Sequence, residues 1–146
     1  MINAVVPVRD TRDLAWMAEQ AIKLYRSRNA RIHLLSVQTP LPVHVSRFFS
    51  GADLRGFHND NGMLSLEPVI KMLDEAGVPH KDHVLVGREA ETIVRFAEEY
   101  HCKCIVLENR AEGWLSALGL GEISSQVQHL MRARHLEASL GAVNVL

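Results

Sequence analysis

Short apolar segments alternate along the chain with segments whose apolar residues recur at helical spacing. The apolar segments are Ile2–Val8, Arg31–Val37 and Cys104–Leu107, the last of them rich in β-branched residues, and His80–Val86 contains a further strand. The helical patterns run over Leu14–Tyr25, Leu66–Leu73, Ala90–Tyr100 and Ile123–Met131. Strands that alternate with helices pair in parallel through right-handed crossovers. The sequence therefore predicts an α/β fold, a three-layer sandwich of about four helices around a mainly parallel sheet.

The length and charge of the chain restrict its class further. A chain of 146 residues fits one domain, residues 1–146, and its net charge of −1 lacks the clustered positive charge of nucleic-acid-binding proteins. No apolar run approaches the length of a membrane span, and Met1 leads into a strand rather than a signal peptide. A disulfide between Cys102 and Cys104 would be strained, so we expect reduced thiols and a cytoplasmic location.

Two regions interrupt the regular alternation. Between Gln38 and Asn61, several prolines and glycines break any long element, while three phenylalanines argue against disorder, so we expect a flap over the sheet or a subunit boundary. We expect Ser65 to cap the helix that follows and Gly77 to end it. Near the carboxyl end, the helical pattern extends as far as Gly141, and Val143–Leu146 is a candidate for a final strand.

The stretch Cys104–Val127 is the best candidate for a ligand site. A buried strand is followed by a polar, glycine-bearing loop, Glu108–Gly121, and Glu122 then opens an amphipathic helix. A parallel strand, a loop and a helix start together present unpaired backbone N–H groups to an anion. We therefore expect any small molecule to bind at this loop.

The order of the segments resembles the universal stress protein family, whose members have a flavodoxin-like α/β domain. The resemblance runs over most of the chain to about Met131, and its pieces are Ala4–Val8, Glu75–Val78, Gly87–Ala90, Cys104–Leu107 and Gly121–Ser124. It implies a five-stranded sheet in the order 3-2-1-4-5. It also implies a non-catalytic stress-response or regulatory domain that acts as a homodimer with a protein partner that the sequence does not identify.

ATP-binding members of this family carry an Asp at the end of the first strand and a G-x2-G-x9-G-S/T motif after the fourth. Here the spacing of the glycine motif is kept, but its four positions are occupied by Glu108, Ala111, Gly121 and Glu122. At the end of the first strand, Arg9 replaces the Asp, and Asp10 comes one place late. Carboxylates beside a polyphosphate repel it in a partly desolvated cleft. We therefore expect a degenerate nucleotide site, no ATP bound in the family manner and no cofactor. The alternative is a sensor of AMP or ATP, or a weak ATPase, that uses the same crevice.

In the family's strand order the first and fourth strands are neighbours. Arg9 would then lie beside the loop that begins at Glu108, which predicts an ion pair of Arg9 with Glu108 or with Glu122. The alternative is that neither charge has a role. The residues expected to line the crevice are Pro7, Val8, Arg9, Asp10, Val37, Leu107, Glu108, Asn109, Arg110, Ala111, Gly121, Glu122, Ile123 and Ser124.

Other groups of reactive residues give weaker signals. The run His101–Cys104 has metal-ligand residue types, but its thiols should point to opposite faces, so we expect no metal. Ser125 and His129 could form a nucleophile pair, yet no acid is placed to orient the histidine, and we expect no catalytic residue. Trp114 is either a flap on the crevice or a subunit contact. We expect neither nucleic acid nor membrane as a partner.

Overall fold

In a computed structural model of the chain, five parallel strands form one sheet. The structure describes residues 1–9, 14–107, 126–127, 129–131 and 139–140. The sheet has the order β3-β2-β1-β4-β5 and consists of β1 (Asn3–Pro7), β2 (Arg31–Gln38), β3 (His80–Val86), β4 (Cys102–Ile105) and β5 (Ser139–Leu140). Every pairing in it is parallel. The predicted fold class and strand order are therefore confirmed.

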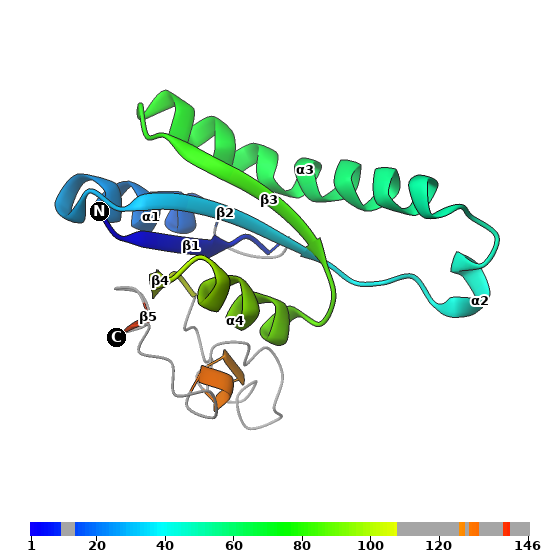
Figure 1. Cartoon of the computed structure of the whole chain (residues 1–146). Helices are drawn as coiled ribbons and strands as arrows, with labels where there is room; N and C mark the ends of the chain where they lie inside the picture. The colour runs from blue at the N-terminus through cyan, green and yellow to red at the C-terminus, as the bar shows by residue number, and fades with distance from the viewer. Residues whose placement is uncertain (10–13, 108–125, 128, 132–138, 141–146) are drawn as a thin grey trace, which may run out of the picture.

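Helices cover both faces of this sheet (Figure 1). α1 (Leu14–Arg28) and the long α3 (Gly51–Glu75) pack on one face, where Met17, Val69 and Ala4 belong to the same buried cluster. α4 (Glu89–Glu99) packs on the other face, where Ile93 shares a second cluster with Val5. Residues 126–127 and 129–131 are also helical. Adjacent residues of β1 thus face different layers, as strand geometry requires.

The region between β2 and β3 differs from its prediction. It contains α2 (Val43–Ser46) and the first half of α3, where we expected a flap or a subunit boundary with no long element and at most a short helical turn. Ser50 caps α3, because its hydroxyl accepts a 3.0 Å hydrogen bond from the backbone N–H of Asp53. Ser65, the predicted cap, instead lies mid-helix and bonds the carbonyl of Asn61. The cap at Ser50 and the packing of the buried stripe from His58 to Leu73 outweigh the helix-breaking tendency of the glycines.

Two strands near the carboxyl end are also displaced from their predicted positions. β4 begins at Cys102 rather than at Cys104, and a register irregularity opposite Asn3 and Ala4 interrupts its pairing with β1. β5 consists of Ser139 and Leu140, which we had assigned to an extended helix. The predicted final strand, Val143–Leu146, lies outside the described residues. By contrast, Gly77 follows α3 with a φ of 70°, as predicted for a residue that ends a helix.

Gly62 fixes the distance between α3 and β3. It is buried on the inward face of α3, and a methyl group added there would overlap the side chain of Val84. Glycine therefore allows the helix to lie closer to the edge strand than any other residue would. No helix in the described part of the chain combines the length and the hydropathy needed to cross a bilayer.

We predict that Gly62→Ala lowers the free energy of unfolding by about 1–3 kcal/mol, because overpacking forces the helix or the strand to shift. Denaturant unfolding of the purified protein measures this loss. In a Val84→Ala background the same substitution should cost little, since the overlapping methyl groups are gone. An equal loss in both backgrounds would show that the contact with Val84 is not the cause.

Candidate functional site

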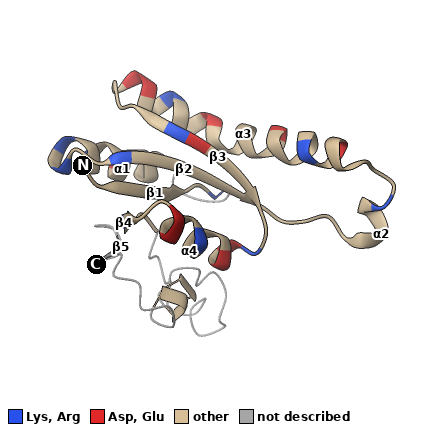
Figure 2. Ribbon diagram, in the orientation of Figure 1, with Lys and Arg blue, Asp and Glu red and all other residues tan. Residues whose placement is uncertain are grey.

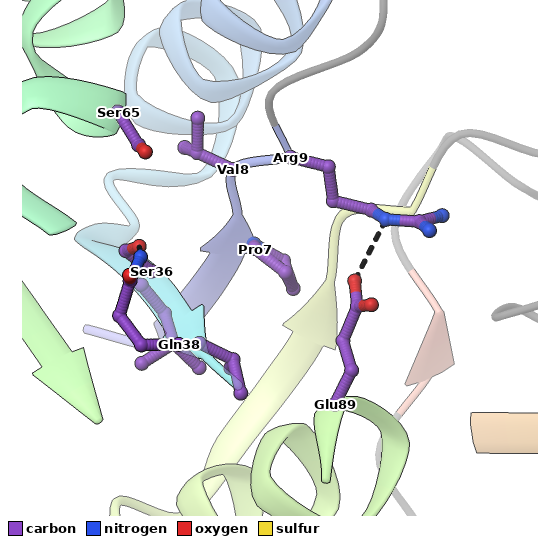
Figure 3. Close-up of a pocket in the computed structure, with 9 residues that line it drawn as sticks. Pro7, Val8, Arg9, Ser36, Gln38, Ser65 and Glu89 are labelled. Atoms are coloured by element: carbon purple, nitrogen blue, oxygen red, sulfur yellow. Dashed lines mark hydrogen bonds and ion pairs between the residues drawn. The ribbon is translucent and has the colours of Figure 1, made fainter. Parts of the chain in front are cut away.

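A cavity of about 190 Å³ lies at the carboxyl ends of β1 and β2 (Figure 3). In open parallel sheets the carboxyl ends of the strands are where ligands bind. The cavity is bounded by the ends of the two strands, the middle of α3 and the start of α4. Its lining residues are Pro7, Val8, Arg9, Leu35, Ser36, Val37, Gln38, Ser65 and Glu89.

Backbone hydrogen bonds hold the walls of the cavity together. The N–H of Val8 donates to the carbonyl of Leu35 at 2.8 Å, which fastens the end of β1 to β2. The N–H of Gly87 donates to the carbonyl of Gln38 at 3.0 Å and so draws the start of α4 toward the end of β2. A Cβ at Gly87 would lie 2.6 Å from the Thr92 hydroxyl oxygen, so the turn requires glycine. Glu89 reaches the cavity because of this turn.

The charged part of the cavity is an ion pair between Arg9 and Glu89. Arg9 Nε lies 2.7 Å from Glu89 Oε1, and both side chains are about one-third exposed. Glu89 is the first residue of α4, where the helix dipole favours a carboxylate. Figure 3 shows the terminal amino groups of Arg9 directed away from Glu89 and also away from the side chains of Ser36, Gln38 and Ser65. Arg9 can therefore bind an anion through these groups while its Nε stays on Glu89.

The uncharged part of the cavity is built from hydroxyl and amide groups. The Gln38 side chain donates to the Ser36 hydroxyl oxygen at 3.0 Å, and the Ser65 hydroxyl donates to the Asn61 carbonyl at 3.1 Å. The Ser36 hydroxyl accepts in its bond, so its proton is available to a ligand. The Ser65 hydroxyl donates in its bond, so its oxygen can accept from a ligand. The cavity thus combines one cation with polar groups suited to the hydroxyls and ring nitrogens of an organic ligand.

The structure brings together part of the predicted crevice. Four of the residues predicted for the crevice, Pro7, Val8, Arg9 and Val37, line the cavity described here. Leu107 is buried in the core on the α4 side and is not a lining residue among those described. The other predicted residues lie outside the described part of the chain, and they are Asp10, Glu108, Asn109, Arg110, Ala111, Gly121, Glu122, Ile123 and Ser124. The proposed pairing of Arg9 with Glu108 or Glu122 therefore stays a prediction, and the partner seen here is Glu89.

Sequence reasoning missed several residues of the cavity. Ser36 and Gln38 are polar residues at the carboxyl end of an apolar strand. Polar residues at such a strand end could have indicated that they line a ligand site. Glu89 stands in a segment recognised as a helix start, but nothing in the sequence indicated that this start faces β1. Ser65 was assigned to a cap, which concealed its position in the wall of the cavity. These contacts depend on packing between elements far apart in the chain.

The two thiols lie apart from this cavity, whereas Ser125 and Trp114 lie outside the described residues. Cys102 packs in the core on the α4 side, whereas Cys104 packs in the core on the α1 and α3 side. Burial raises the pKa of Cys102 to about 12, with a further contribution from Cys104, so this thiol is protonated and poorly nucleophilic. Among the described residues, no group of three or more His, Cys, Asp or Glu side chains could hold a metal ion.

A polar network joins His33, which is buried beneath α4, to His83, which is partly buried. His33 Nδ1 lies 3.0 Å from His83 Nε2, and His33 Nε2 lies 3.2 Å from Asn3 Oδ1. The Asn3 amide nitrogen donates to the carbonyl of Tyr100, which fixes its oxygen toward His33. An amide oxygen only accepts, so His33 carries its proton on Nε2 and accepts from His83 at Nδ1. Phe96 packs against both rings.

This network favours neutral histidine. Burial lowers the pKa of His33 to about 4, and the charges of His83, Lys81 and Arg31 contribute. Burial also lowers the pKa of His83. On the other face of β3, burial alone would lower the pKa of His80, but hydrogen bonds to Asp74 and Asp82 outweigh it and raise the pKa.

Comparisons with known proteins add to this geometry. A sequence model of the universal stress protein family matches residues 2–133. No curated protein sequence matches the chain. A universal stress protein in complex with cAMP aligns with a TM-score of 0.67 at 18% identity, covering 95% of this chain and 94% of that chain. The universal stress protein from Archaeoglobus fulgidus in complex with dAMP aligns with a TM-score of 0.57 at 18% identity, covering 88% of this chain and 90% of that chain.

A universal stress protein family protein from Arabidopsis thaliana with AMP bound has a TM-score of 0.58 at 21% identity, covering 96% of this chain and 89% of that chain. At these identities the likeness shows the fold. The three complexes contradict our expectation that a chain of this kind carries no cofactor. That expectation rested on the carboxylates of Glu108 and Glu122, which lie outside the described residues.

The burial of His33 predicts a loss of stability in acid. Between pH 6.5 and about 4 the unfolded chain protonates His33 while the folded chain does not, so the free energy of unfolding falls by about 2–3 kcal/mol as the pH falls. His33→Gln should remove most of this slope. Denaturant unfolding at a series of pH values measures both. If the His33→Gln variant keeps this slope, other titrating groups cause it. His80, whose pKa is raised, affects the free energy of unfolding above pH 6.5 instead.

Proposed function

The chain belongs to the universal stress protein family, and from this premise we propose that it is a regulatory domain that binds an adenine nucleoside monophosphate such as AMP or cAMP. The proposed site is the cavity at the carboxyl ends of β1 and β2. The observation that carries the proposal is Arg9, a cation at the end of the central strand with its terminal amino groups directed away from Glu89 (Figure 3).

The charge of the site favours a monophosphate over a triphosphate. The phosphate would bind the terminal amino groups of Arg9, whose planar guanidinium suits a phosphate oxygen pair. Glu89 remains 2.7 Å from Arg9 Nε, so every added phosphate brings more negative charge toward this carboxylate. A nucleoside monophosphate meets the least repulsion.

The polar groups of the cavity suit the nucleoside. Ser36, Gln38 and Ser65 provide hydroxyl and amide groups for the sugar hydroxyls or the ring nitrogens of adenine. A volume of 190 Å³ is less than the 300–1,000 Å³ of typical ligand pockets, so the described residues would enclose one part of the ligand. The complexes of related proteins with cAMP, dAMP and AMP support this class of ligand.

The remaining parts of the proposal come from the sequence. We propose that residues 1–146 form a single domain that acts without catalysis, as a homodimer, in the cytoplasm. Its output would pass to a protein partner rather than to nucleic acid or a membrane. The family resemblance and the near-neutral charge of the chain support these statements.

The proposal predicts selective binding that depends on Arg9. Isothermal titration calorimetry with AMP, cAMP and ATP should give measurable affinity for the monophosphates and weaker affinity for ATP. Arg9→Ala should weaken AMP binding by roughly 10- to 100-fold, because it removes charge-assisted hydrogen bonds. Glu89→Gln should reduce the preference for AMP over ATP, because it removes the opposing carboxylate.

Arg88→Ala is the matched control. Its side chain is 86% exposed and does not line the cavity, yet the substitution removes the same charge one residue from Glu89. AMP affinity should hardly change. If none of the three nucleotides binds, the proposal is wrong. If Arg88→Ala weakens binding as much as Arg9→Ala, net charge rather than a phosphate contact explains the effect.

A further inference from the structure

His80 lies between two carboxylates at the junction of α3 and β3. Figure 2 shows acidic residues at the carboxyl end of α3 and near the start of β3. His80 Nδ1 is 2.6 Å from Asp82 Oδ1, and His80 Nε2 is 2.8 Å from Asp74 Oδ1. The side chain of His80 is only 10% exposed, whereas those of Asp74 and Asp82 are 63% and 23% exposed. Both ring nitrogens thus contact an anion, and one of these contacts joins two elements of the fold.

The fold places these three residues on one side of the sheet. Asp74 lies in the last turn of α3, six residues before His80. His80 and Asp82 are two residues apart on β3, so their side chains share one face of the strand. Their neighbours on β2 are Ile32 and Leu34, both of which belong to the core beneath α1 and α3. The face that carries His80 is therefore the face that α3 covers.

The two contacts require a positively charged imidazole. A carboxylate only accepts hydrogen bonds, and a neutral imidazole has a single N–H. In neutral His80, one ring nitrogen would therefore turn a lone pair toward a carboxylate oxygen at hydrogen-bond distance. An imidazolium donates from both nitrogens and satisfies both contacts. His33 differs, because its partners are an amide oxygen and a second histidine.

Asp74 of α3 and Asp82 of β3 are the charged groups that hold this proton. Burial alone would lower the pKa of His80, but hydrogen bonds and the charges of the two carboxylates outweigh it and raise the pKa. Arg31 on β2 and Lys81 on β3 alternate with the residues that face α3, so they lie on the opposite face of the sheet. No described cation is among the charges that shift this pKa.

Loss of the proton would act first on the contact with Asp74. Neutral His80 can keep one hydrogen bond, and its contact with Asp82 is the shorter and the less exposed of the two. Asp74 is mostly exposed, so its carboxylate can turn into water and avoid the lone pair at little cost. The bond within β3 would then persist, while the bond between α3 and β3 would break.

We propose that Asp74, His80 and Asp82 form a proton-dependent clasp, which ties the end of α3 to β3 while His80 is charged and releases it when the proton leaves. β3 is the edge strand of the described sheet and pairs there with β2 alone. Residues 76–79, which connect α3 to β3, would therefore open more often in the released state. The inference does not depend on nucleotide binding, because none of the three residues lines the cavity.

The clasp predicts that the fold loses stability as the pH rises. The folded chain holds the proton of His80 more tightly than the unfolded chain, where histidine titrates near 6.5. The contribution of the clasp is therefore complete below pH 6.5 and is lost as the pH rises through the pKa of the folded state. In denaturant unfolding, the excess stability of the wild type over His80→Gln should shrink over this range. An excess that stays constant would overturn the proposal.

Nitrogen-15 NMR of histidine-labelled protein tests the protonation state. The signal of His80, identified by its absence from His80→Gln, should show both ring nitrogens protonated at about pH 6 and a midpoint above 6.5. Asp74→Asn should lower the midpoint, because it removes one carboxylate. Glu75→Gln is the matched control, since it removes the same charge from the next residue, which makes neither contact with His80. A single protonated nitrogen at this pH, or equal effects of the two variants, would overturn the proposal.

Hydrogen exchange tests whether the proton controls the junction. The N–H of Val78 donates to the carbonyl of Leu73 at 2.9 Å and reports on the connection between α3 and β3. After correction for the intrinsic exchange rate, its protection should fall by roughly 10-fold as the pH rises through the midpoint of His80. The N–H of Val8, at the other end of the sheet, should keep its protection. Unchanged protection of Val78 while His80 titrates would show that the clasp does not release the junction.

Discussion

The burial of β1 between two parallel neighbours is the constraint on which the rest of the structure depends. Ala4, Val5 and Val6 are completely buried, and the strand pairs with β2 on one side and with β4 on the other. A strand of this kind must be covered on both faces, so helices have to return the chain above and below the sheet. Its carboxyl end then emerges between those layers, and Arg9 stands at that position.

The order of the elements could be predicted from the sequence because strand and helix periodicities are local. β3, α1 and α4 lie close to their predicted limits, since β-branched runs and apolar stripes identify them. α3 was predicted much too short, because Gly51, Gly56 and Gly62 were counted as helix breakers. Gly62 is required by the close approach of Val84, and a contact between distant elements cannot be seen in a local pattern.

The candidate site was predicted less completely than the fold. The end of β1 was among the predicted crevice residues, since the carboxyl ends of parallel strands are where crevices open. The contribution of α4 was not, because Glu89 meets Arg9 through tertiary packing, at a helix start whose Gly87 bonds the carbonyl of Gln38. The residues Glu108 and Glu122, on which the sequence argument against a cofactor depended, lie outside the described part of the chain. Related structures that hold adenine nucleotides supplied the correction.

The carboxylate of Glu89 is fixed to the same molecule as the guanidinium it meets. Its effective concentration at Arg9 is therefore set by the geometry of the fold and does not fall when the protein is diluted. An anion from solution that needs the whole guanidinium must displace this tethered group, which raises the apparent dissociation constant of that anion by a fixed factor. The turn at Gly87, which places α4, thus determines the range of ligand concentrations to which the cavity responds.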